Sequence, residues 1–143
     1  MKRKNLLVMT VVGLMFSTAA LADDIPVSVN QLPSSVKVFV RNNFKGKSII
    51  YAEKDFKTYE CRLSDGTKVE FTKKGDWKKV DSNDMTAVPS ALVPTIIMKY
   101  VHCTFPGASI TKIEKERYGY DIELSNDLEL KFNRQGVLLR MDD

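Results

Sequence analysis

The chain has 143 residues, of which 28% are charged and 43% hydrophobic, and its formal net charge is +4. Three basic residues, Lys2, Arg3 and Lys4, precede a short apolar run, and without them the net charge falls to +1. A nearly neutral chain of this size fits one domain and argues against nucleic acid as a partner.

The N-terminus has the pattern of a secretory signal peptide. After the basic residues an uncharged apolar run extends from Leu6 to Phe16, and small residues lead to Ala22, after which we expect cleavage. An uncleaved membrane anchor is the alternative, but the run is shorter than the ~20 residues that a membrane span needs. We therefore expect a signal peptide at 1–22 and a single domain at 23–143. That domain would be periplasmic or secreted, with no stable membrane insertion after cleavage.

An internal repeat dominates the rest of the chain. The segment Tyr-Glu-Cys-Arg-Leu-Ser-Asp-Gly (59–66) returns 61 positions later as Tyr-Asp-Ile-Glu-Leu-Ser-Asn-Asp (120–127). Val-Glu-Phe (69–71) and Val-Asp (80–81) return in the same order as Leu-Lys-Phe (130–132) and Met-Asp (141–142). A unit of about 55–60 residues is marginal for a core of its own. We therefore expect two repeats, about 29–84 and 85–143, that share one core.

Each repeat is predicted to open with a helix. Pro33 and Pro89 each stand beside a serine, which is a helix start signal, and apolar residues follow at helical spacing. These prolines are 56 positions apart, whereas Phe44 and Phe105 near the helix ends are 61 apart. The second helix is therefore expected to be five residues longer, although Pro94 in its first turn suggests that it really starts near Val93 or is kinked there.

After each helix the apolar period changes to two, which is typical of strands. Tyr59, Cys61 and Leu63 alternate with polar residues, and Asp65-Gly66 is a strong hairpin signal. With further strands at 49–54 and 110–115, each repeat becomes a helix followed by an antiparallel meander of about four strands. The predicted fold class is α+β: two tandem repeats that form one shared antiparallel sheet with the helices on one face.

These motifs resemble the PepSY-like family. The resemblance rests on the Leu-Pro and Val-Pro openings, Tyr-Glu-Cys-Arg-Leu-Ser-Asp-Gly, Val-Glu-Phe, Gly-Asp-Trp and Val-Asp, and it covers both repeats. The family consists of exported bacterial proteins, frequent in relatives of Bacteroides, whose paired repeats look similar to the β-lactamase inhibitory protein fold. The resemblance implies a periplasmic or surface protein that binds proteins or peptides, with a suspected inhibitory role. It carries no catalytic or binding residues over to this chain.

Catalytic motifs are missing from the sequence. His102 is the only histidine, and its neighbour Cys103 would point about 100° away from it on a helix, which is poor geometry for a dyad. No CxxC, HxxxH, GxGxxG or P-loop occurs. We therefore expect no enzyme, no cofactor and no metal site.

The carboxylates Asp121, Glu123 and Glu129 are expected together on the outer face of the sheet. Ordinary polar-out alternation, softened by Lys112 and Lys131, accounts for them. A weak calcium site or an acidic contact patch is the alternative, although calcium cages usually draw backbone oxygens from loops.

The solvent face of the sheet is the expected recognition surface. The candidate partner-binding residues share that predicted face, and the set includes Tyr, Trp and Arg, the types that tend to dominate interface energy: Tyr51, Arg62, Lys68, Trp77 and Lys79. Trp77 could instead simply pack at the sheet edge. The chain is thus expected to be an exported module that binds an unidentified protein or peptide of the cell envelope, for which inhibition of an exported hydrolase is one role. A periplasmic ligand or envelope-stress sensor is the alternative, and it would need an apolar concave pocket.

The two cysteines allow two interpretations. Export permits a disulfide between Cys61 and Cys103, provided that their Cα atoms lie within ~7 Å. Alternatively, Cys61 is a buried small hydrophobe, because it shares a face with Tyr59 and Leu63.

Overall fold

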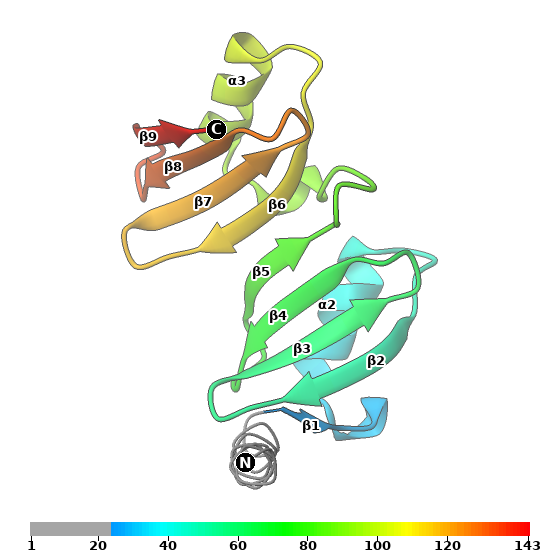
Figure 1. Ribbon diagram of the computed structural model, residues 1–143. Helices are drawn as coiled ribbons and strands as arrows, with labels where there is room; N and C mark the ends of the chain where they lie inside the picture. The colour runs from blue at the N-terminus through cyan, green and yellow to red at the C-terminus, as the bar shows by residue number, and fades with distance from the viewer. Residues whose placement is uncertain (1–23) are drawn as a thin grey trace, which may run out of the picture.

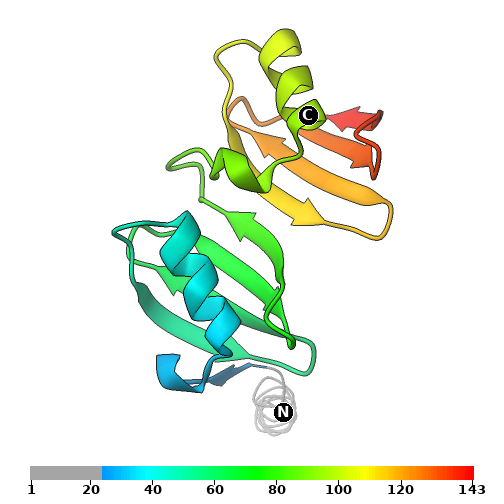
Figure 2. The same cartoon turned by 180° about the vertical axis from the view of Figure 1, so that it is seen from behind.

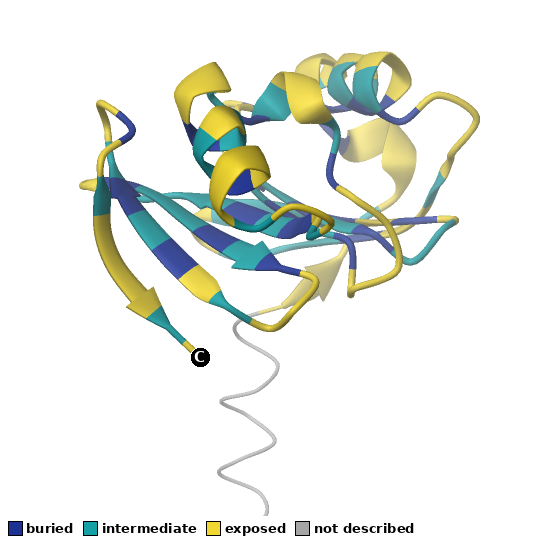
Figure 3. Ribbon diagram, turned by 90° about the horizontal axis from the view of Figure 1, so that it is seen from above, coloured by how far each residue is buried: buried dark blue, intermediate teal, exposed yellow. Residues whose placement is uncertain are grey.

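The computed structural model describes residues 24–143, so the expected signal peptide and its cleavage point lie outside the described residues. Within this range nine strands form one antiparallel sheet in chain order, and two α-helices lie on one face of it (Figures 1, 2 and 3). The predicted fold class is confirmed. The strands are β1 (Ile25–Pro26), β2 (Ile49–Lys54), β3 (Thr58–Leu63), β4 (Lys68–Thr72), β5 (Trp77–Asp81), β6 (Ile110–Lys115), β7 (Gly119–Leu124), β8 (Glu129–Asn133) and β9 (Leu138–Asp142).

The helices correct one detail of the predicted repeat. Both α2 (Ser34–Asn43) and α3 (Thr95–Thr104) have 10 residues, and their N-caps are Pro33 and Pro94, which are 61 positions apart. The prediction of a longer second helix from Pro89 is therefore wrong, and the alternative of a later start near Val93 is close to the observed start at Thr95. Proline disfavours a helical conformation in the residue before it, and that residue, Val93, is extended. The intervening segment is a separate 3-10 turn, Ser90–Leu92, whose counterpart in the first repeat is Val29–Gln31.

One hydrophobic core serves both repeats. It lies between the helices and the sheet, and it includes Val36 and Val40 of α2 with Ile97 and Val101 of α3. Each repeat places a fully buried phenylalanine edge-to-face against an aromatic of its helix. Phe71 lies 5.3 Å from Phe39, and Phe132 lies 5.5 Å from Tyr100, between ring centroids. Such pairs stabilise a fold by about 0.5–1.5 kcal/mol beyond the contribution of the apolar area that they bury.

The repeats are joined by the pairing of β5 with β6, in which Val80 lies opposite Ile113. Both side chains are fully buried, and the backbone N–H and hydroxyl of Ser82 both donate to the carbonyl oxygen of Thr111 at 2.9 Å. The sheet therefore continues without a break from one repeat into the other. Across residues 24–143, the helices are too short or too polar to cross a lipid bilayer.

Candidate functional site

One face of the sheet points away from the helices and is here called the open face (Figure 3). The strand register places two rows of side chains on it. Alternation along each strand sends every second side chain to this face, and the cross-strand register aligns them over β2–β9. The first row is Glu53, Glu60, Glu70, Lys79, Glu114, Asp121, Lys131 and Arg140. The second row is Tyr51, Arg62, Lys68, Asp81, Lys112, Glu123, Glu129 and Asp142.

Three of the predicted partner-binding residues are direct neighbours in the second row. Tyr51, Arg62 and Lys68 lie opposite one another on β2, β3 and β4. The guanidinium carbon of Arg62 is 5.6 Å from the centre of the Tyr51 ring, and both side chains are exposed. A fourth predicted residue, Lys79, belongs to the first row on β5. The open face thus holds a compact group, here called the basic patch, formed by Tyr51, Arg62 and Lys68.

Trp77 lies on the opposite face, and its assignment to the solvent face is wrong. A bulge at Lys78 shifts the register, so that Lys79 pairs with Glu70 but Trp77 pairs with the buried Phe71. The Trp77 ring packs 6.3 Å from Phe39 of α2, with the ammonium of Lys115 4.0 Å from its centre. Trp77 therefore packs, as the alternative interpretation expected, but it does so on an inner strand of the sheet and not at the sheet edge.

The bulge also turns Lys78 toward the open face. Its ammonium nitrogen lies 3.5 Å from Glu70 and 3.9 Å from Glu114, so it bridges the two repeats across the first row. Nothing in the strand alternation indicates this ion pair, because alternation alone would have placed Lys78 toward the helices.

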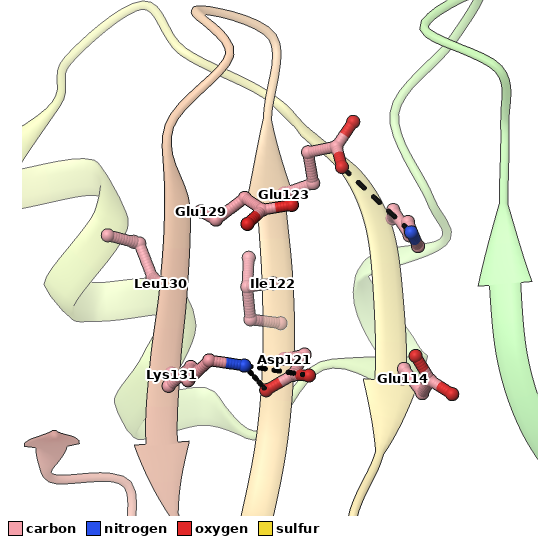
Figure 4. Close-up of a pocket in the computed structure, with 8 residues that line it drawn as sticks. Glu114, Asp121, Ile122, Glu123, Glu129, Leu130 and Lys131 are labelled. Atoms are coloured by element: carbon pink, nitrogen blue, oxygen red, sulfur yellow. Dashed lines mark hydrogen bonds and ion pairs between the residues drawn. The ribbon is translucent and has the colours of Figure 1, made fainter. Parts of the chain in front are cut away.

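The acidic residues of the second repeat border a shallow depression of about 120 Å³ (Figure 4). Asp121 accepts hydrogen bonds from the Lys131 ammonium at 3.2 Å and from the Tyr118 hydroxyl. Glu123 lies 4.0 Å from Lys112 and directly opposite Glu129. Burial raises the pKa of Glu123, while Lys112 acts in the other direction. The expected clustering of Asp121, Glu123 and Glu129 is therefore confirmed, with two of the three paired to lysines.

No group of three or more His, Cys, Asp or Glu side chains is arranged to hold a metal ion in the part of the chain that is described. The carboxylates at the depression project from paired strands, which supply no free loop carbonyls. This arrangement differs from the loop-built cages that calcium usually occupies.

The two repeats differ most in the charge of the second row. Arg62 and Lys68 of the first repeat correspond, 61 positions on, to Glu123 and Glu129. The second row is therefore basic over β3–β4 and acidic over β7–β8. In the first row, Glu53, Glu60 and Glu70 are consecutive across β2–β4, and burial, Asp24 and Glu60 raise the pKa of Glu53.

The cysteines are not bonded to each other. Cys61 is fully buried on the helix side of β3, whereas Cys103 is exposed on α3 in the other repeat. Of the two interpretations, the possible Cys61–Cys103 disulfide is not present in this structure, and a buried small hydrophobe at Cys61 is confirmed. Burial raises the pKa of the Cys61 thiol to about 12, which keeps it protonated and unreactive.

The comparison with protein families agrees with the repeat. The family described as "Putative beta-lactamase-inhibitor-like, PepSY-like" matches residues 21–67 and again residues 57–140. A search of curated proteins found no match.

Solved structures from Bacteroides are similar over nearly their whole length. A "putative calcium-regulated periplasmic protein" from Bacteroides thetaiotaomicron is 39% identical, with a TM-score of 0.78, over 84% of this chain and 97% of that one. Two proteins from Bacteroides vulgatus, each described as a putative periplasmic protein, are 36% and 32% identical, both with a TM-score of 0.78. They cover 85% and 84% of this chain, and 98% and 99% of their own.

Proposed function

The chain belongs to the PepSY-like family, and from this membership we propose that it is a periplasmic, non-enzymatic protein that binds another protein or a peptide through its open face. The observation that carries the proposal is the open face itself. It extends over β2–β9, and no other segment of residues 24–143 covers it (Figure 3). A sheet face of this size without a covering layer is suited to a partner.

The basic patch supplies the candidate anchor. Tyr and Arg are the residue types that most often dominate interface energies, and here Tyr51 supports the guanidinium of Arg62 from the side. Lys68 continues the positive charge onto the next strand. We propose that acidic side chains of the partner lie over this patch.

The opposite charge at the other end of the second row would orient the partner. Glu123 and Glu129 place negative charge over β7–β8, so a partner with matching polarity would bind in one direction only. Charged contacts at the rim of an interface raise the association rate more than the affinity, and salt screens them. Binding should therefore weaken as ionic strength rises.

Inhibition of an exported hydrolase remains one role for such a module, and it rests on the family description alone. The alternative of a ligand sensor would need an apolar concave pocket, and the depression on the open face is lined mostly by charged side chains. Calcium regulation belongs to the description of the B. thetaiotaomicron relative. The lysine-paired carboxylates of this chain do not fit a calcium cage, so we do not extend that property to it.

The test compares two charge-reversal variants in capture of partners from periplasmic extract. Arg62→Glu with Lys68→Glu reverses the basic patch, and Arg41→Glu with Lys45→Glu makes the same charge change on the helix side, where both residues are exposed. We expect the first variant to lose at least ~10-fold in affinity for a captured protein and the second to retain it. Equal retention by both variants would contradict a role for the open face, as would a loss confined to the helix-side variant.

A further inference from the structure

The last strand of the second repeat lacks a neighbouring strand that the corresponding strand of the first repeat has. In the first repeat the outer side of β5 pairs with β6, with Lys79 opposite Glu114, Val80 opposite Ile113 and Asp81 opposite Lys112. The strand that corresponds to β5 in the second repeat is β9, 61 positions later. Within residues 24–143 no strand pairs with the outer side of β9, which forms the end of the sheet (Figure 1).

A side chain of β9 is more exposed than its counterpart in β5. Val80 of β5 is 0% exposed, whereas its counterpart Met141 of β9 is 42% exposed. Leu139 of the same strand and Val137 just before it are also more than half exposed. An exposed apolar edge strand is a template for pairing with another chain.

The backbone of β9 matches that of β5 in its irregularity as well. Both strands carry a bulge at the same position, Lys78 in β5 and Leu139 in β9. In β5 this bulge does not prevent pairing, because β6 joins the three residues that follow it. The three corresponding residues of β9 are Arg140, Met141 and Asp142.

We propose that β9 binds an extended peptide segment of a partner protein by antiparallel strand addition. The pattern of the segment follows from the β5–β6 pairing: a basic residue opposite Asp142, an apolar residue opposite Met141 and an acidic residue opposite Arg140, as in Lys112-Ile113-Glu114. Backbone hydrogen bonds provide the affinity in this mode, and the alternate side chains provide the specificity. This site is the outer backbone edge of β9, where Arg140 and Asp142 end the two rows of the open face, and strand addition there does not depend on the function proposed for the basic patch.

The ion pair within β9 does not prevent strand addition. Arg140 and Asp142 contact each other at 2.9 Å, but the pair is exposed to solvent, where such bridges contribute little. Each charge can therefore turn to a cross-strand partner. A second copy of the chain fits less well as occupant, because its corresponding strand β2 already pairs with β1, and the Val27 N–H already donates to the Ala52 carbonyl oxygen.

The probe is a blocked synthetic peptide with the chain's own sequence 109–116, Ser-Ile-Thr-Lys-Ile-Glu-Lys-Glu, titrated into isotope-labelled protein and followed by amide chemical shifts. We expect shift changes centred on residues 138–142. A control peptide with the central Lys and Glu exchanged should bind at least ~3-fold more weakly, because two cross-strand charge pairs become repulsive.

A protein variant completes the test. Arg140→Glu combined with Asp142→Lys reverses both charges at exposed or half-exposed positions, and it should invert the preference between the two peptides. Shift changes centred on the open-face residues of β2–β7 and absent from β9, or equal binding of both peptides to both proteins, would overturn the proposal. So would self-association of the protein that this variant abolishes, without any peptide binding, since the occupant would then be a second copy.

Discussion

Replacement of Gly75 by alanine tests how the helix layer is held on the sheet. Gly75 lies in the turn between β4 and β5 with φ of +92°, close to the start of α2. An added Cβ would collide with the Ser35 hydroxyl oxygen, and it would lie 3.2 Å from Ser35 Cβ and 3.4 Å from Pro33 Cβ. The left-handed backbone costs alanine about 1–2 kcal/mol. Crowding against the helix start adds about 1–3 kcal/mol, toward the lower end because the hydroxyl can rotate away.

The chain contains a matched control for the backbone contribution. Gly66 has nearly the same φ, +91°, but its added Cβ would meet nothing within 4 Å. Gly66→Ala should therefore show the backbone cost alone, and Gly75→Ala should exceed it by the crowding cost. Urea unfolding followed by far-UV circular dichroism measures both free energies of unfolding.

A second substitution, at Ser35, tests which atom the added Cβ at Gly75 collides with. Ser35→Ala removes the hydroxyl oxygen at an exposed helix position and should by itself change stability little. In that background the cost of Gly75→Ala should fall. Equal costs for Gly75→Ala and Gly66→Ala would refute the packing of this turn against α2. An unchanged cost in the Ser35→Ala background would show that the hydroxyl is not the atom that collides.

Four further predictions concern the core, the cysteines and the open face. Trp77→Ala should lower the free energy of unfolding by about 2 kcal/mol, which is less than the loss for a fully buried tryptophan. Trp77→Leu should lower it only slightly, because Leu138 stands at that position in the second repeat. Urea unfolding measures both variants, and partner capture by the leucine variant should be unchanged. A thiol reagent at pH 8 should modify Cys103 and spare Cys61 until the protein unfolds, and two fast-reacting thiols would contradict the burial of Cys61. The raised pKa of Cys61 also predicts that stability falls as pH rises above about 9, the ordinary value of the thiol, toward 12, and a Cys61→Ala variant should lack this component. Glu60→Gln should stabilise by roughly 0.2–1 kcal/mol at pH 7, because it removes a charge opposite Glu53. Since the pKa of Glu53 is raised, its ionised form costs stability above the ordinary pKa of 4.5, so a gain that persisted at pH 3 would point to another cause.

The sequence predicted the fold well because the repeat presents each signal twice. Alternation of apolar residues identified the strands at 49–54 and 110–115 with the bounds that the structure shows. The start of the second helix was harder to predict, because two prolines, Pro89 and Pro94, both fit the pattern of a helix start. Only the packed structure assigned Pro89 to a short 3-10 turn and Pro94 to the start of α3.

Alternation also placed most of the open face correctly. It put Arg62, Lys68 and the acidic residues of the second repeat on one side of the sheet, and their neighbours on the other. It failed at Trp77, because a single bulge at Lys78 reverses the sides for the residues before it. A bulge is a property of the pairing between two strands, so the sequence of one strand does not reveal it.

The sequence alone thus determined the repeat, the strand order within each unit and the face of most side chains, since these follow from local periodicity. The tertiary structure decided which side chains stand opposite one another, because register depends on strands that are distant in sequence. From that register came the reversal of charge along the second row and the ion pairs of Lys78. It also showed that β9 ends the sheet with Met141 exposed, at the position where Val80 of β5 is buried by the next strand.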